Sequence, residues 1–180
     1  MLRKLITRIV GIFFFIAATH TFALQTGATL SLPLIKKDPP NLHGAYASYW
    51  FQPDAMIYQR FQIYFELGAA HWSVNNGSYS SINTFSISPV LRAYFKKFQT
   101  FSPYLELSIG PTYLSKTHLG DRNLGMHFAF QDYVGVGSTF GKDQRWFASI
   151  DTFHYSNAAL SKMNAGITIP VVLRIGYRFT

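Results

Sequence analysis

Apolar and polar residues alternate along most of this chain, so that each extended segment has one apolar side and one mixed side. In residues 60–72 the odd positions are mostly large and apolar, whereas the even positions include arginine, glutamine and glutamate. The same alternation continues through 84–95, 101–113 and 167–179. A period of two residues indicates a β-strand with two different faces. The pattern therefore predicts an all-β fold.

Turn-forming residues divide the alternating pattern into eight predicted strands. An even number of antiparallel strands, each about 10 residues or longer and apolar on its outward side, is typical of a transmembrane β-barrel. A soluble β-sandwich also alternates, but with shorter strands and more charge on its exposed face. The predicted strands lie near 25–33, 42–52, 59–73, 82–96, 101–114, 126–140, 145–156 and 167–179.

The composition favours the barrel. Aromatic residues make up 17% of the chain and charged residues only 13%, whereas charged residues are about a quarter of a typical soluble domain. Residues 1–23 combine a basic start, an apolar run and a small residue at the end, which predicts a cleaved signal peptide. The alternative is an N-terminal membrane anchor, for which the run is short. We therefore expect residues 24–180 to form an outer-membrane β-barrel.

The net charge and the lack of cysteine limit the classes of ligand and partner that this chain is expected to bind. The formal net charge is +8, and the chain has no cysteine for a disulfide or a thiolate metal site. An exported chain does not meet nucleic acid, so anionic lipid headgroups are the expected partner. No histidine spacing predicts a metal site, and no cofactor is expected. Basic residues predicted at the outer rim either contact lipid phosphates or are simply solvated; they are Lys36, Lys37, Lys116, Arg122 and Lys162.

Strand direction places one short motif at the outer rim. With both termini periplasmic, the connections near 53, 97 and 142 are periplasmic, and those near 39, 76, 121 and 164 are extracellular. The seventh strand then ends at the outer rim with His154-Tyr155-Ser156. Residues i and i+2 of a strand lie on one face, about 6–7 Å apart. Because Ser149 and Asp151 suit the barrel interior, we expect His154 and Ser156 to face the outer leaflet.

This pair has the chemistry of an activated nucleophile. A serine hydroxyl becomes reactive when a neighbouring imidazole takes its proton. Amides of Asn157 and Asn164, or nearby backbone N–H groups, are candidates to stabilise an oxyanion. The alternative is that His154 and Ser156 simply end a strand, because a short motif is a hypothesis until its context confirms it.

These motifs resemble a known family, the lipid A 3-O-deacylases (PagL-type) found in the outer membrane of Gram-negative bacteria. The resemblance implies an eight-stranded barrel, as a monomer or homodimer, with lipid A or lipopolysaccharide as substrate. It implies Ser156 as the nucleophile and His154 as the base. The residues that carry it are Phe153-His154-Tyr155-Ser156-Asn157-Ala158, Asn164-x-Gly166, Gly120-Asp121-x-Asn123-Leu124-Gly125, Phe130-Gln131-Asp132, Gly135, Gly137 and Pro103-Tyr104-Leu105-Glu106.

One expected residue is missing. The family pattern places a glutamate two residues after the glycine of Asn-x-Gly, to orient the histidine, and this chain has Thr168 there. A substitute acid is Asp132, which parity places on the lipid face opposite Thr152 or His154. The alternative is that a bulge turns Asp132 into the lumen, towards an arginine such as Arg92 or Arg174.

Two functions follow from the sequence. The first is a serine esterase that hydrolyses the 3-O-linked acyl chain of lipid A at the outer leaflet, with Ser156, His154 and Asp132 as the catalytic residues. The second is a non-catalytic barrel, either structural or a degenerate deacylase that binds lipid A. The paired His154 and Ser156 favour the enzyme, and Thr168 favours the second reading.

Overall fold

The structure is a computed structural model that describes residues 24–96 and 98–179. It contains eight long strands, and each agrees with a predicted strand to within two residues at either end. The predicted signal peptide, residues 1–23, lies outside the described residues. The long strands are β1 (Leu24–Ile35), β2 (Leu42–Pro53), β4 (Phe61–Val74), β5 (Ser81–Tyr94), β6 (Phe101–Leu114), β9 (Phe128–Phe140), β10 (Trp146–Ser156) and β11 (Ile167–Arg178).

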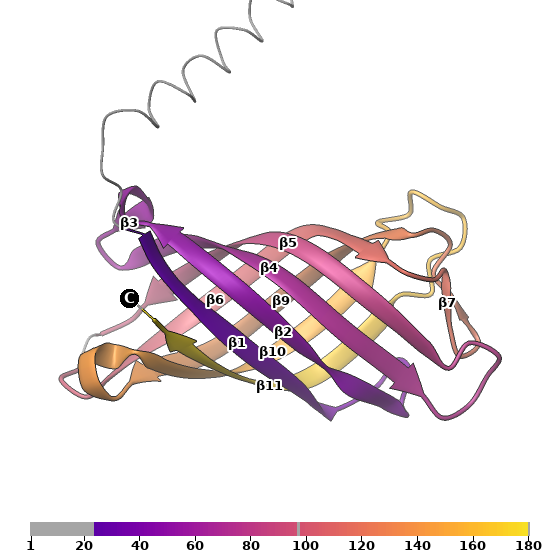
Figure 1. Ribbon diagram of the computed structural model, residues 1–180, viewed down its shortest axis with the longest axis horizontal. Helices are drawn as coiled ribbons and strands as arrows, with labels where there is room; N and C mark the ends of the chain where they lie inside the picture. Colours follow the sequence, from indigo (N-terminus) through magenta and orange to yellow (C-terminus); the bar gives the residue numbers. More distant parts are fainter. Residues whose placement is uncertain (1–23, 97, 180) are drawn as a thin grey trace, which may run out of the picture.

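The long strands close into a barrel. Each pairs antiparallel with its neighbours along the chain, and β1 also pairs with β11, from Gly27 opposite Arg178 to Ile35 opposite Val171. The strands run obliquely to the barrel axis (Figure 1), as closure of a sheet requires. Every long strand therefore has two partners, and the backbone polar groups are satisfied within the wall. The predicted eight-stranded antiparallel barrel is confirmed.

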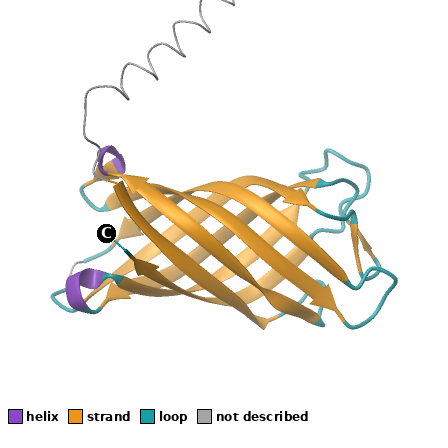
Figure 2. Cartoon of the chain, viewed as in Figure 1, coloured by secondary structure: helices purple, strands orange, loops and turns teal. Residues whose placement is uncertain are grey.

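The connections gather at the two ends of the barrel, as the predicted strand directions require. We call the end that holds residues 24 and 179 the terminal end, at the left of Figure 1, and the opposite one the loop end. The terminal end carries the short helices η1 (Asp54–Met56) and η2 (Lys142–Gln144) and the short strand β3 (Ile57–Tyr58) (Figure 2). The loop end carries the connections 36–41, 75–80, 115–127 and 157–166.

Some small elements were not predicted. The connection 115–127 contains a hairpin of β7 (His118–Leu119) and β8 (Arg122–Asn123), whose strands are too short to display a period. The two short helices have three residues each. Within the described residues, no helix has the length and apolar character needed to cross a membrane.

The two faces of the wall differ as the alternation predicted. The inward face is buried and mixes aromatic with polar side chains, and two buried arginines connect three buried acids. Arg174 donates to Glu66 (2.9 Å) and Glu106 (3.1 Å), and Arg92 donates to Glu106 (2.8 Å). Arg174 also lies 3.6 Å from Asp151. The outward face is apolar, with exposed side chains that include Leu107, Ile109, Val134, Val136, Ile150 and Ile175.

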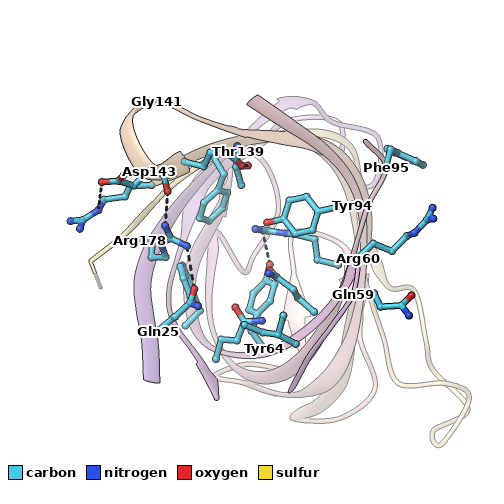
Figure 3. A pocket seen from close by; sticks show the side chains of 18 of the residues that line it. Gln25, Gln59, Arg60, Tyr64, Tyr94, Phe95, Thr139, Gly141, Asp143 and Arg178 are labelled. Carbon is cyan, nitrogen blue, oxygen red and sulfur yellow. Dashed lines mark hydrogen bonds and ion pairs between the residues drawn. The ribbon is translucent and has the colours of Figure 1, made fainter. Parts of the chain in front are cut away.

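A cavity of about 630 Å³ opens at the terminal end of the barrel. Figure 3 looks into it: Arg178 bonds to Gln25 on one side, and Tyr64 and Tyr94 lie on the other. Its lining belongs to the end of the barrel opposite His154 and Ser156. This cavity is therefore separate from the candidate active site.

Candidate active site

The last residues of β10 present His154 and Ser156 on the outward face at the loop end. Their neighbours Phe153 and Tyr155 are buried inside the barrel, at 0% and 1% exposure, whereas His154 and Ser156 are partly exposed. Asp151 is buried on the inward face. The face predicted for His154 and Ser156 is therefore the face on which they lie.

Strand register places polar residues from four segments in one row across the wall. His154 on β10 lies opposite Asp132 on β9 and opposite Thr168 on β11. Thr168 in turn lies opposite Asp38, from the connection between β1 and β2. Directly opposite residues point to the same face with Cβ atoms about 4.5–5.5 Å apart. We call Asp38, Thr168, His154 and Asp132 the polar row.

The imidazole of His154 is held by Thr168. Its Nδ1 atom lies 3.0 Å from Thr168 Oγ1. A proton on Nδ1, donated to that hydroxyl, leaves the Nε2 lone pair available to take a proton from a nucleophile. No hydrogen bond joins Ser156 Oγ to His154 within the described part of the chain. Such bonds commonly tighten only when substrate is bound.

Asp132 lies on the outward face, opposite His154, which is one of the two pairings expected from the sequence. The alternative in which a bulge turns it into the lumen is wrong, because β9 and β10 stay in register there. The lumenal arginines bind Glu66, Glu106 and Asp151 instead. Among the described residues, however, Asp132 makes no hydrogen bond or ion pair with His154; that place is taken by Thr168.

The connection after Ser156 is organised by two asparagines. Asn157 is 1% exposed and donates both amide hydrogens, to Leu124 O (2.9 Å) and Met163 O (2.7 Å). Its backbone N–H donates to Asn164 Oδ1 (2.9 Å). The side-chain and backbone N–H groups of Asn157 are thus all used within the loop, whereas the amide nitrogen of Asn164 has no hydrogen-bond acceptor among the described residues.

Unusual backbone conformations follow directly after the nucleophile candidate. Ala158 and Ala159 both have positive φ, at 52° and 62°. Two consecutive alanines in the left-handed region are strained, and such strain concentrates at functional sites. The hydrogen bonds of Asn157 to Leu124 and Met163 hold the loop in this shape.

Gly166 lies against the imidazole. It has a φ of 62°, and a Cβ atom there would lie 3.4 Å from Cε1 of His154 and 2.9 Å from the carbonyl oxygen of Tyr155. A side chain would therefore press on the ring and strain the backbone. The glycine of the Asn-x-Gly motif is therefore explained by local packing, because only a residue without a side chain lets the loop approach His154 this closely.

An apolar groove of about 590 Å³ lies nearby on the outward face of β5, β6 and β9. Register connects it to the serine, because Phe130 lies opposite Ser156 on one side and Pro111 on the other. Pro111 is itself part of the groove, together with Phe85, Ile87, Tyr113, His127 and Phe128. An elongated apolar ligand can thus extend from Ser156 over Phe130 into the groove.

Comparison with known proteins shows which family this sequence matches. Residues 43–178 match the model of the family described as Lipid A 3-O-deacylase (PagL). Curated proteins called Lipid A deacylase PagL are 32% identical over 104 residues (Pseudomonas aeruginosa) and 32% over 114 residues (Bordetella bronchiseptica). These alignments cover 58% and 63% of this chain, and 58% and 61% of the relatives' own length.

Two solved structures share the fold. The crystal structure of the outer membrane enzyme PagL aligns with a TM-score of 0.64 and 24% identity, covering 86% of this chain and 99% of that one. Neisserial surface protein A aligns with a TM-score of 0.53 and 10% identity, covering 87% and 96%. At these identities the likeness establishes the barrel architecture, while the family match rests on the sequence.

Proposed function

This chain belongs to the PagL family of lipid A 3-O-deacylases, and from that premise we propose that it is a serine esterase of the outer membrane. Its substrate is lipid A, and its reaction removes the 3-O-linked acyl chain. The observation that carries the proposal is the outward-facing pair of His154 and Ser156, with Thr168 bonded to the imidazole. A purely structural barrel has no need for a hydrogen-bonded imidazole beside a serine on its lipid face.

The position of the pair fits a lipid substrate. It lies at the rim of an apolar outer wall, where the acyl chains and headgroups of the outer leaflet meet. The groove beyond Phe130 suits an acyl chain, because it is lined mainly by aliphatic and aromatic side chains. Burial of each methylene group of the chain contributes about 0.8 kcal/mol.

The reaction follows from the roles of the two residues. His154 Nε2 accepts the hydroxyl proton as Ser156 Oγ attacks the ester carbonyl carbon, which gives a tetrahedral oxyanion. The imidazolium then donates that proton to the departing 3-oxygen of lipid A, leaving an acyl group on Ser156. Water attacks this acyl-serine with His154 again as base, releasing the fatty acid and the free serine.

Two asparagines support the oxyanion in this proposal, with different tasks. Asn164 supplies the donor, because its amide nitrogen is available and its Oδ1 is fixed by the Asn157 backbone. Asn157 acts as polar support: its buried amide holds the loop that carries Asn164. A correctly aimed donor of this kind is worth about 10²–10³ in rate.

Orientation and charge come from different neighbours of His154. Thr168 orients the ring through its hydroxyl but brings no negative charge. Asp132, on the other side of the imidazole in the polar row, supplies that charge through space. It favours the imidazolium that forms as Ser156 loses its proton.

The competing proposal is a degenerate barrel that binds lipid A without hydrolysing it. Thr168 favours it, because loss of the acid from a triad costs about 10⁴ in kcat. The two proposals differ in turnover. Purified, folded protein should release 3-hydroxy fatty acid from lipid A in detergent micelles, and Ser156→Ala should not. Binding of lipid A with no release by the wild type would support the degenerate barrel.

A further inference from the structure

Arg122 connects the third loop-end connection to the residues around His154. It lies in β8, at the variable position of Gly-Asp-x-Asn-Leu-Gly, and its side chain is partly buried. Nε donates to the carbonyl oxygen of Gly166 (2.8 Å), and Nη2 donates to that of Ala165. Nη1 donates to Asp38 Oδ1 (3.2 Å). One guanidinium thus binds two segments that are far apart in the sequence.

Asp38, the partner of Arg122, is also bonded to Thr168 through the backbone. The N–H of Thr168 donates to Asp38 O (2.8 Å), and the N–H of Asp38 donates to Thr168 O (3.2 Å). This is an isolated bridge, formed where β1 has already ended. Without it, no strand would cover this side of β11 at Thr168.

One of the two segments bound by Arg122 touches the imidazole directly, and the other, at Asp38, reaches it through the backbone of Thr168. Gly166 packs against Cε1 of His154, and Thr168 Oγ1 bonds to Nδ1. We propose that Arg122 and Asp38 are positioning residues for catalysis, an ion pair that fixes Gly166 and Thr168 and thereby aims His154 at Ser156. This proposal rests on the proposed function, because it assigns the ion pair a task in the same hydrolysis.

The chemistry of the chain explains why such a pair is needed. A glutamate at position 168 would orient the imidazole by charge as well as by hydrogen bonding. A threonine hydroxyl orients the imidazole only through a neutral hydrogen bond, which is weaker than a charge-assisted one. The position of the hydroxyl must therefore be fixed by its surroundings. Two backbone hydrogen bonds from Asp38 and a fork of donors from Arg122 supply that fixed place.

The alternative task for Arg122 is to bind a phosphate of lipid A directly. Its contacts argue against this, because Nε and both Nη atoms already donate to protein oxygens. Asp38 also neutralises the charge that a phosphate would need. A phosphate contact would act on substrate binding and hence on KM, whereas positioning of His154 acts on kcat.

The test compares four variants of the full-length barrel in detergent micelles: Arg122→Ala, Arg122→Lys, Asp38→Ala and Lys116→Ala. Lys116 is the matched control, since it is an exposed cation in the same connection and makes no contact to the polar row among the described residues. Arg122→Ala should lower kcat by about 10- to 100-fold with KM unchanged, as expected for a misplaced catalytic group. Arg122→Lys should recover part of that loss, and Lys116→Ala should leave kcat unchanged.

A second readout does not depend on turnover. In protein labelled with ¹⁵N-histidine, the imidazole signals of His154 are identified by their loss in His154→Ala. Arg122→Ala and Asp38→Ala should shift or broaden the His154 signals and leave those of His43 unchanged. If the wild type releases no fatty acid, the proposed function fails, and the imidazole signals still decide the role of the ion pair.

Three results would overturn the proposal. One is a rise in KM at constant kcat in Arg122→Ala, which would indicate a phosphate contact. Another is an equal loss of kcat in Lys116→Ala, which would indicate a general effect of charge. The third is that the His154 signals stay unchanged in Arg122→Lys and Asp38→Ala. These two variants retain most of the loop contacts, so they keep the test decisive even if Arg122→Ala does not fold.

Discussion

Replacing Thr168 with glutamate should accelerate ester hydrolysis. The Thr168 hydroxyl lies 3.0 Å from His154 Nδ1, so a carboxylate introduced there reaches the same nitrogen. Two unit charges about 4 Å apart interact by about 4 kcal/mol at an effective dielectric constant of about 20. The site is partly exposed, and we halve this to about 2 kcal/mol for solvent screening. At about 1.4 kcal/mol per tenfold, the expected gain in kcat is about 30-fold.

The matched control is Thr168→Gln, which has nearly the same size and hydrogen-bonding reach as glutamate but no charge. The assay is release of fatty acid from purified lipid A, with the amount of folded barrel measured by heat-dependent gel mobility. Glutamate should raise kcat, and glutamine should leave it at or below the wild-type value. Equal rates in the two variants, with the barrel folded, would refute the reasoning and mean that His154 lacks no charge.

The remaining predictions concern other residues of the site and the lumen. Asp132→Asn should leave the barrel folded and lower hydrolysis by at least about 10-fold; wild-type activity in this variant would exclude a role for its charge. Adding Thr168→Glu to Asp132→Asn should recover part of the loss, whereas strictly additive effects would mean that the two acids do not share one task. Asn164→Ala should lower kcat by about 10²-fold with little change in KM, and a change in KM alone would place Asn164 in substrate binding. Arg174→Ala should destabilise the barrel by about 3–5 kcal/mol in urea titrations, since it leaves Glu66 and Asp151 buried without their arginine; an unchanged urea midpoint would contradict this.

The sequence predicts the barrel well, because each long strand carries its own signal. Alternation with a period of two is repeated over strands of 11 to 14 residues, and turn residues mark where it stops. Parity then settles which face each side chain takes. The same reasoning extends across a hairpin, which is why the pairing of Asp132 with His154 is predictable from a short connection between β9 and β10.

Contacts between loops carry no such signal. Nothing in the local sequence relates Asp38 to Thr168, or Arg122 to Gly166, because these pairs meet only when the barrel closes. Register also does not determine which neighbour a side chain bonds. Asp132 and Thr168 both lie opposite His154, and the imidazole bonds to Thr168. The acid expected from the hairpin is therefore in place, but its hydrogen bond is not formed.

The central claim, that this barrel hydrolyses lipid A through Ser156, is tested most directly by mass spectrometry of lipid A from a Gram-negative host. Cells that express the wild type should contain lipid A lighter by one 3-hydroxyacyl chain. Cells with equal amounts of folded, membrane-inserted Ser156→Ala or His154→Ala should contain unmodified lipid A. Unmodified lipid A in cells that carry folded wild-type protein would contradict the claim, and so would an equal mass loss in the Ser156→Ala cells.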